Sequence, residues 1–324
     1  MTDHLPLLGI ELVGQSPAAV HVRELVRRAA PADGGVLLVG EPGADLISVA
    51  RDVHDRSHPA GQPWQWLACA DEDGLTGTQR LFGTPASDDG DVVRVTPDSV
   101  VALARGGTLL LQDVAELSAG LQARLARMLR DGEVGVGDSR QPLHVRFIAT
   151  SGPSIDEDTR SRRFRHDLYR RISVSRIDLP ALRDRAADIP ALADRMLQEA
   201  CAAAGLSPRR FTHAAHALLT ALNWPRNIAE LRSVVERVVA TTDVSVIQIE
   251  HLLPGLQLAR PTPSVAPVGT LRDARQRFER EYIGAVLQHH AWQLGDAART
   301  LGIQRPNLYR KARQLGIPLA KQPA

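Results

Sequence analysis

The sequence predicts an α/β fold in which helices cover both faces of a parallel sheet, with an all-helical region after it. Four short apolar runs of buried-strand type support this prediction, namely Gly35–Val39, Gly107–Gln112, Val145–Thr150 and Val174–Leu179. Apolar strands of this kind that alternate with helices are typical of parallel sheets buried on both sides. Beyond Pro180 the apolar pattern is helical only, so a helical region follows the sheet.

The helices follow in order from the same periodicity. We expect helices at Ile47–His54 after the first strand and at Leu117–Leu129 after the second. Three more, at Asp188–Ala203, Thr212–Leu222 and Ile228–Thr241, make up the helical region.

Composition limits the class of protein. Hydrophobic residues make up 44% of the chain, which excludes wholesale disorder, and no apolar run is long enough for a transmembrane helix. The two cysteines, Cys69 and Cys201, are too few for a disulfide framework or a zinc site, and the 11 histidines are scattered. We therefore expect a cytoplasmic protein without a metal site and without membrane association.

A linker divides the chain between Arg260 and Gly269. Its ten residues include three prolines, and because proline fixes φ and donates no backbone hydrogen bond, we expect an extended segment. The charge changes at the same place, since residues 271–324 hold ten Arg and Lys against four Asp and Glu, whereas residues 1–270 hold 29 against 33. The basic segment fits either a polyanion-binding appendage or a solvated charged helix.

The basic segment has the pattern of a helix-turn-helix. A long helix is expected at Leu271–His289 and a short one at Leu294–Leu301, with Gly302 as the turn. A last helix runs from Arg305 to about Leu315, and Pro306 lies in its first turn, where the missing N–H costs little.

The last helix carries polar and cationic side chains and no acidic residue: Arg305, Asn307, Tyr309, Arg310, Lys311 and Arg313. Leu308 and Ala312, four residues apart, are expected to face inward. Arg and Asn can read base edges, and Lys and Tyr can hold phosphates. The pattern therefore predicts binding to double-stranded DNA, and the alternative is a basic helical hairpin that only packs on the rest of the chain.

The first strand, loop and helix have the layout of a phosphate-binding loop. Working loops read G-x-x-x-x-G-K-S/T, in which backbone N–H groups cradle phosphate, the Lys reaches the β- and γ-phosphates and the hydroxyl holds Mg²⁺. The string here starts with Gly40 and contains Gly43, but Asp45 stands at the second glycine, Leu46 at the lysine and Ile47 at the hydroxyl. Asp45 brings negative charge to the place of the phosphate. The residues alone therefore predict a plain strand–turn–helix.

Residues 8–257 resemble the AAA+ domain of the sigma-54-dependent activators, also called bacterial enhancer-binding proteins. The similar strings are Val13–Pro17, Leu81–Gly83, Gly106–Asp113, Phe164–Ile172, Leu179–Ile189 and Trp224–Leu231, in the order of the family. Near the C-terminus, Trp292–Ile303 and Leu308–Lys311 resemble the Fis-type DNA-binding domain that ends these activators.

The resemblance implies an AAA+ P-loop-type parallel sheet with helices on both faces, a helical lid subdomain and a C-terminal all-α helix-turn-helix domain. The implied divisions are residues 1–181 for the α/β subdomain, 182–258 for the lid, 259–270 for the Pro-rich linker and 271–324 for the Fis-type domain. In the family the long helix before the helix-turn-helix forms a dimer, so Phe278, Tyr282 and Val286 form either that interface or an intramolecular core.

Departures from the family pattern gather at the positions that handle nucleotide. The Walker B acidic pair matches Gln112 and Asp113, and an amide cannot supply the carboxylate charge that a hard divalent cation prefers. The two sensor positions that follow strands match Ala68 and Ser151, and the sensor arginine of the lid matches Ala229.

Two other features bear on the expected activity. Arg165 and Arg171 match the trans-acting arginine fingers of the family and are retained. The GAFTGA loop, through which the family contacts sigma-54, has no counterpart between Gly83 and Gly106.

We therefore expect a sequence-specific DNA-binding transcription regulator on an AAA+ scaffold without ATP hydrolysis, without sigma-54 contact and without a cofactor, while binding of ATP without turnover stays open. Two alternatives stay open: an ATP-dependent sigma-54 activator with divergent motifs, and an effector-sensing regulator that binds a ligand such as a cyclic dinucleotide in the vestigial nucleotide cleft. The expected partners are double-stranded DNA, further copies of the chain in a homodimer or larger homo-oligomer, and a regulatory protein or small-molecule effector.

Overall fold

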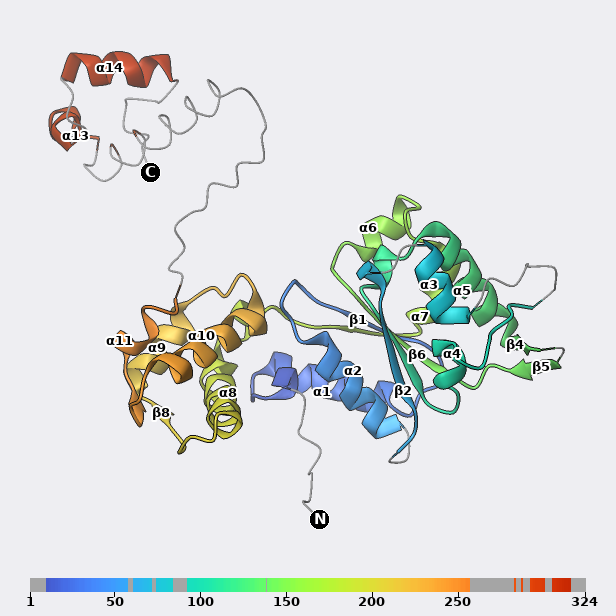
Figure 1. Cartoon of the computed structure of the whole chain (residues 1–324). Coiled ribbons are helices and arrows are strands. Elements are labelled where there is room, and N and C mark those ends of the chain that lie inside the picture. Colours follow the sequence, from blue (N-terminus) through green and yellow to red (C-terminus); the bar gives the residue numbers. More distant parts are fainter. Residues whose placement is uncertain are drawn as a thin grey trace. The chain divides into compact units, whose positions relative to one another are not determined.

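The computed structural model describes residues 10–57, 61–71, 74–83, 92–137, 139–256, 283, 287, 292–300 and 305–315 (Figure 1). The chain divides into two compact units, Met1–Gln257 and Leu258–Ala324. The linker, the turn at Gly302 and the interface candidates Phe278, Tyr282 and Val286 lie outside the described residues.

The first unit is built on a five-stranded sheet with the order β2-β3-β6-β1-β7. Its strands are β1 (Val36–Val39), β2 (Trp64–Ala68), β3 (Thr108–Gln112), β6 (Arg146–Ser151) and β7 (Ser175–Asp178), and every neighbouring pair is parallel. The predicted parallel sheet is confirmed, and all four apolar runs form strands within it. Because the strands are parallel, their carboxyl ends lie at one edge of the sheet and their amino ends at the other.

Helices cover both faces of this sheet (Figure 1). On one face lie α1 (Pro17–Ala29) and α2 (Leu46–Ser57). The other face is covered by α3 (Gly74–Phe82), α4 (Val100–Leu103), α5 (Ala119–Asp131), α6 (Ile155–Arg160) and α7 (His166–Ile172). Successive strand residues alternate between the two cores, so Leu37 and Leu109 pack on one side, and Leu38 and Leu110 on the other.

Short elements complete the α/β part. A hairpin of β4 (Glu133–Val136) and β5 (Ser139–Pro142) extends from the end of α5. Four 3₁₀ segments connect larger elements: η1 (Ile10–Leu12), η2 (Cys69–Asp71), η3 (Val114–Glu116) and η4 (Leu182–Asp188).

The helical region after the sheet is a separate layer with its own core. It contains α8 (Ile189–Ala203), α9 (His213–Ala221), α10 (Asn227–Thr241) and α11 (Ile249–Leu252), with a small sheet of β8 (Arg210–Phe211) and β9 (Val246–Ile247). Trp224 is fully buried in this core and its indole N–H donates to the Leu219 carbonyl oxygen at 2.8 Å. The three predicted helices of this region are confirmed within about one residue at each end.

The second unit contains α13 (Leu294–Thr300) and α14 (Arg305–Gln314). Leu308 and Ala312 are completely buried in a small core with Ile283, Leu287 and Ala297, as their spacing predicted. Within the described part of the chain, no helix is long and apolar enough to cross a bilayer.

Candidate nucleotide cleft and DNA-recognition helix

The predicted phosphate loop runs from Gly40 to Ile47, between β1 and α2. The buried Gly40 donates its N–H to the carbonyl oxygen of Ser151 at 3.2 Å, which ties the start of the loop to the end of β6. Helix α2 begins at Leu46, and the N–H of Ser48 donates to Asp45 Oδ1 at 3.2 Å. The Asp45 carboxylate therefore caps the N-terminus of α2, which is the position where a phosphate-binding loop holds its anion.

A second carboxylate reaches the same loop from η1. Glu11 is only 2% exposed, and its Oε1 accepts the backbone N–H of Asp45 at 2.6 Å. Arg185, from η4, is 3% exposed, forms an ion pair with Glu11 and also donates to the Glu11 carbonyl oxygen at 2.6 Å. Burial lowers the pKa of Arg185, and the charge of Asp188 opposes this effect. The backbone N–H of Asp45 thus donates to the buried Glu11 carboxylate, and the counter-ion of this carboxylate, Arg185, is also buried.

Sequence reasoning missed both Glu11 and Arg185. Glu11 precedes Val13–Pro17, and Arg185 lies within Leu179–Ile189, a string that indicates the family but no pairing. The available signal was an acidic residue between the apolar residues Ile10 and Leu12, but it does not reveal a partner 174 residues away.

The helical region contacts the loop directly. Ala229 donates its N–H to the carbonyl oxygen of Gly43 at 3.0 Å, and Asn227 Nδ2 donates to the carbonyl oxygen of Pro42 at 3.1 Å. A Cβ atom added at Gly43, whose φ is +84°, would lie 2.0 Å from the Arg226 carbonyl oxygen. The loop and the helical region therefore meet backbone to backbone at a place where only glycine fits.

Two further sets of polar contacts join the helical region to the α/β part. Arg183 of η4 forms two hydrogen bonds to the Glu41 carboxylate at 2.6 and 2.7 Å, and these bonds lower the pKa of Glu41. Asp188, which is 2% exposed, accepts the backbone N–H groups of Gln15 and Ser16 at 2.9 and 2.8 Å. The helical region is thus held against the segment before α1 as well as against the loop.

The Walker B and sensor positions lie at the same edge of the sheet. Gln112 ends β3 and its Nε2 donates to Asp113 Oδ2 at 3.4 Å, while the Asp113 N–H donates to Thr150 Oγ1 at 3.0 Å. Ala68 pairs with Gln112 in the strand register. Ser151 is buried, and its hydroxyl has no hydrogen-bond partner among the described residues.

The structure therefore brings together Gly40, Gly43, Asp45, Leu46, Ile47, Gln112, Asp113, Ser151 and Ala229 at the carboxyl edge of the sheet. Within the described ranges, no group of three or more His, Cys, Asp or Glu side chains could hold a metal ion. The carboxylates of Glu11 and Asp45 accept backbone N–H groups of the loop and of the first turn of α2, and the Glu41 carboxylate of the loop is paired with Arg183.

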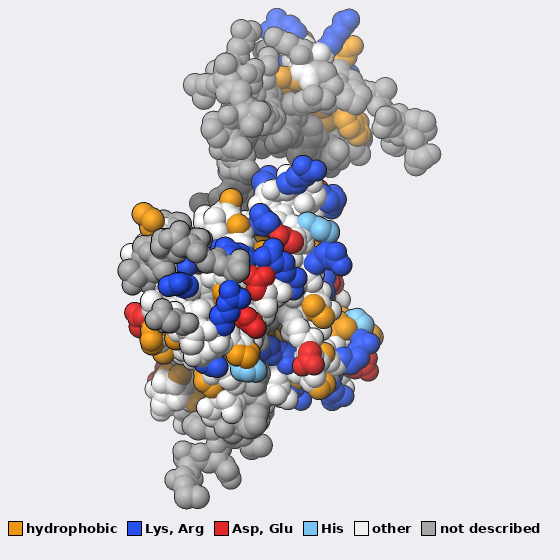
Figure 2. Space-filling view, turned by 90° about the vertical axis from the view of Figure 1, so that its right-hand side faces the viewer, with side chains coloured by type: hydrophobic (Ala, Val, Ile, Leu, Met, Phe, Trp, Pro, Cys, Tyr) orange, Lys and Arg blue, Asp and Glu red, His pale blue; other side chains and the backbone are white. Residues whose placement is uncertain are grey.

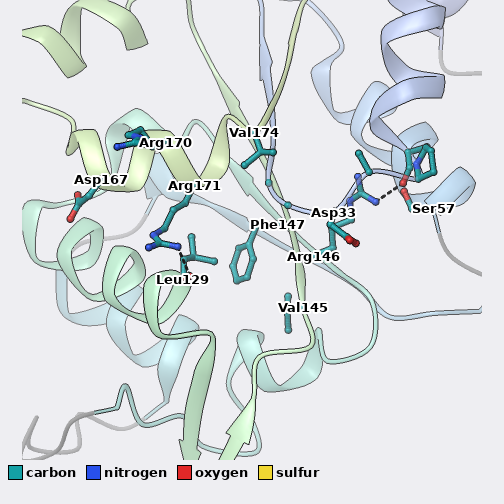
Figure 3. Close-up of a pocket in the computed structure, with 15 residues that line it drawn as sticks. Asp33, Ser57, Leu129, Val145, Arg146, Phe147, Asp167, Arg170, Arg171 and Val174 are labelled. Atoms are coloured by element: carbon teal, nitrogen blue, oxygen red, sulfur yellow. Dashed lines mark hydrogen bonds between the residues drawn. The ribbon is translucent and has the colours of Figure 1, made fainter.

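The two arginine-finger positions lie elsewhere in the chain. Arg165 precedes α7 and forms two hydrogen bonds to Asp167 at 2.7 and 3.0 Å, which raise the pKa of Arg165 and lower that of Asp167. Arg171, in the last turn of α7, donates to the Leu129 carbonyl oxygen at 3.0 Å (Figure 3). Within one chain, neither of them meets the loop. Residues 84–91, where the sequence lacks the GAFTGA string, lie outside the described residues.

All six predicted DNA-binding residues lie on α14 and are exposed: Arg305, Asn307, Tyr309, Arg310, Lys311 and Arg313. Arg310 Nη2 donates to Asn307 Oδ1 at 3.3 Å, so these two side chains share one face of the helix. Figure 2 shows Lys and Arg side chains on the described part of this unit, whereas on the visible face of the first unit they are interspersed with Asp and Glu. An exposed basic helix next to a second short helix can enter a major groove.

Three family models match the chain. Residues 12–178 match the sigma-54 interaction domain, residues 183–266 match the AAA+ ATPase lid domain, and residues 274–315 match the Fis family of bacterial regulatory proteins.

Curated relatives cover nearly the whole chain. The nitric oxide reductase transcription regulator NorR2 of Cupriavidus necator is 32% identical over 95% of this chain, which spans 64% of the length of that relative. The alginate biosynthesis transcriptional regulatory protein AlgB is 32% identical in Pseudomonas aeruginosa, over 98% of this chain and 70% of that protein.

Solved structures agree with this similarity. NtrX from Brucella abortus superposes with a TM-score of 0.65 and 29% identity, over 94% of this chain and 69% of that one, and a second structure of it contains ATP. RuvB of Thermotoga maritima, at a TM-score of 0.51 and 12% identity over 94% of this chain and 88% of that one, shares the fold alone.

Proposed function

Since the chain belongs to the family of sigma-54-dependent transcription regulators, we propose that it is a DNA-binding regulator whose AAA+ domain does not hydrolyse ATP. It works without a nucleotide or metal cofactor, in the cytoplasm, and its AAA+ domain serves as a scaffold for assembly and control. DNA is its macromolecular partner, and further copies of the same chain form the oligomer.

The observation that carries the loss of turnover is the bond from the Asp45 N–H to the buried Glu11 carboxylate. Phosphoryl transfer depends almost entirely on positioning and on charge stabilisation by a lysine and Mg²⁺. Here Leu46 and Ile47 supply neither group, and the Asp45 carboxylate adds negative charge at the N-terminus of α2. A triphosphate would have to displace Glu11 and leave Arg185 without its buried counter-ion, which is costly.

Loss of sigma-54 remodelling has a separate support. The string between Gly83 and Gly106 contains no aromatic residue and no counterpart of the GAFTGA hexapeptide, in which an aromatic residue and a threonine stand among small residues. A regulator with neither turnover nor this loop acts on transcription through its position on DNA.

The DNA-binding part of the proposal depends on α14. Its N-terminal residues Arg305 and Asn307 approach base edges in the major groove, while Arg310, Lys311 and Arg313 contact mainly phosphates. A dimer presents two such helices and recognises two inverted half-sites.

The alternative, an effector bound in the vestigial nucleotide cleft, has less support than a regulator that works without a ligand there. The Ala229–Gly43 bond and the close approach of Arg226 occupy the space next to the loop with backbone atoms. A ligand there requires the helical region to move away from the loop.

The test is a turnover assay of the full chain with Mg²⁺, ATP and operator DNA, together with ATP binding measured by equilibrium dialysis. We expect hydrolysis at background and no saturable binding. Turnover of about one per second that is abolished by Gln112→Ala would show that the active-ATPase alternative is correct.

A further inference from the structure

A cavity lies at the amino edge of the sheet, away from the loop (Figure 3). It has a volume of about 800 Å³ and is formed where β1, β6 and β7 begin and where α1, α2, α5 and α7 end. This volume lies within the range of about 300–1,000 Å³ that is usual for small-molecule sites.

The middle of the cavity is apolar. Phe147, Val145 and Leu129 line it, and Val174 stands at its margin with 60% of its surface exposed. Figure 3 shows the Phe147 ring between Arg171 on one side and Arg146 with Asp33 on the other. Phe147 itself is only 4% exposed, so a flat apolar group in the cavity contacts mainly Val145 and Val174 while its ends meet polar side chains.

Glycine at the start of β1 shapes one wall. A Cβ atom added at Gly35 would lie 2.5 Å from the Arg171 carbonyl oxygen and 2.6 Å from the Ile172 Cα atom. The backbone before β1 therefore packs directly on the end of α7, and this contact fixes the position of Arg171 relative to the sheet.

Cationic groups exceed anionic ones around the cavity. Arg146, Arg170 and Arg171 line it together with Asp33 and Asp167, and Asp167 is already paired with Arg165. Among the described residues, none forms a hydrogen bond or ion pair with the Arg170 side chain, and the Arg171 side chain donates to the Leu129 carbonyl oxygen.

Arg146 adds a buried donor. Its Nη1 and Nη2 donate to the carbonyl oxygens of Ala30 and Ala29 at 2.6 and 2.5 Å, and its Nε is buried without a described partner. The polar groups around the cavity that have no described partner are therefore mainly N–H donors of arginine side chains.

We propose that this cavity binds a small organic anion, with an aromatic body against Val145 and Val174 and a carboxylate or phosphate on Arg171 and Arg170. Guanidinium groups suit both oxyanions because they offer paired N–H donors in a planar fork. Neither the phosphate loop nor α14 contributes a lining residue, so ligand binding here does not depend on the loss of turnover or on DNA binding, although Arg171 is also an arginine-finger position.

The experiment is a fluorescence titration of the full chain with 1-naphthyl phosphate and, in a parallel arm, 1-naphthoate. The neutral comparison is 1-naphthalenemethanol, and the non-aromatic one is inorganic phosphate. We expect saturable binding at one site per chain for at least one of the two aromatic anions, at least tenfold tighter than for either comparison compound. The arm that binds more tightly identifies phosphate or carboxylate as the natural head group.

Variants locate the site. Arg170→Gln and Arg171→Gln should each weaken binding about tenfold or more, and Arg170→Gln should leave the unfolding midpoint unchanged because it breaks no described contact. Arg130→Gln is the matched control, since Arg130 adjoins Leu129 on α5, is 62% exposed and does not line the cavity. Absence of saturable binding, equal binding of inorganic phosphate, or binding that survives both cavity variants would overturn the proposal.

Discussion

The two edges of the parallel sheet are made by the same strands, but different groups fill them. At the carboxyl edge, where open α/β sheets usually bind ligands, the Glu11 and Asp45 carboxylates and the backbone at Ala229 occupy the loop. At the amino edge a cavity of about 800 Å³ stays open. The position of the ligand site in the family therefore does not show which part of this chain contains an open cavity.

Helix ends explain which charges gather at each edge. The N-terminus of α2 lies at the carboxyl edge and attracts the Asp45 carboxylate. The C-termini of α1 and α5 lie at the amino edge, where Arg146 donates to Ala29 and Ala30 and Arg171 donates to Leu129. The side chains that contact these helix ends thus have the sign that the helix dipoles favour.

The strongest test of the closed carboxyl edge is Arg185→Ala. The change leaves Glu11 buried without a counter-ion, so we expect a loss of about 3–5 kcal/mol in the free energy of unfolding, measured with urea. The matched control is Arg183→Ala, whose pair with Glu41 is solvent-exposed and should contribute far less than the buried pair. Equal losses for the two variants would mean that the buried pair does not hold this edge together.

A second test is steric. Gly43→Ala should cost about 2–4 kcal/mol, because the new Cβ meets the Arg226 carbonyl oxygen and φ is positive. Gly132→Ala is the control, since its φ is +68° but nothing lies within 4 Å, and it should cost about 1–2 kcal/mol from the backbone alone. If urea unfolding gives the same loss for both, the helical region does not press on the loop in solution.

A closed carboxyl edge also predicts that DNA binding depends on α14 and not on nucleotide. The Kd for operator DNA should be the same with and without Mg²⁺ and ATP. Arg305→Ala should cost about 1–3 kcal/mol and relax preference at one base position, whereas Lys311→Ala should weaken all sites alike and reduce the salt slope by about one.

Truncation of the chain at Pro267 controls for the DNA prediction. We expect the truncated chain to lose operator binding in titrations at several salt concentrations. If it binds as tightly as the full chain, α14 is not the recognition helix.

The smallest expected effect is a pH dependence of the carboxyl edge. The bonds from Arg183 lower the pKa of Glu41 below its usual 4.5, so the pair stabilises the fold above that value and the contribution is lost as the pH falls through the lowered pKa. The difference in melting temperature between the native chain and Arg183→Gln should therefore be present at pH 6 and shrink toward pH 3. A difference that is constant over this range would contradict the role of the ionised pair.

Much of this architecture could be predicted because its signals are local. Apolar runs identified β1, β3, β6 and β7, and helical periodicity placed α10 at Ile228–Thr241 against the observed Asn227–Thr241. The exposed face of α14 and the buried Leu308 and Ala312 follow from spacing along one helix. These features depend on neighbours in the chain, so the sequence by itself determined them.

Only the tertiary structure decided how the two edges are filled. The Glu11–Arg185 pair joins residues 174 positions apart, and it forms because the helical region docks on the segment before α1. The cavity arises from the ends of four helices and the starts of three strands, none of which carries a local sign of it. Hydrophobic periodicity records which face of an element is buried but not which distant charge it meets, and this is why the contacts of the loop could not be read from its own residues.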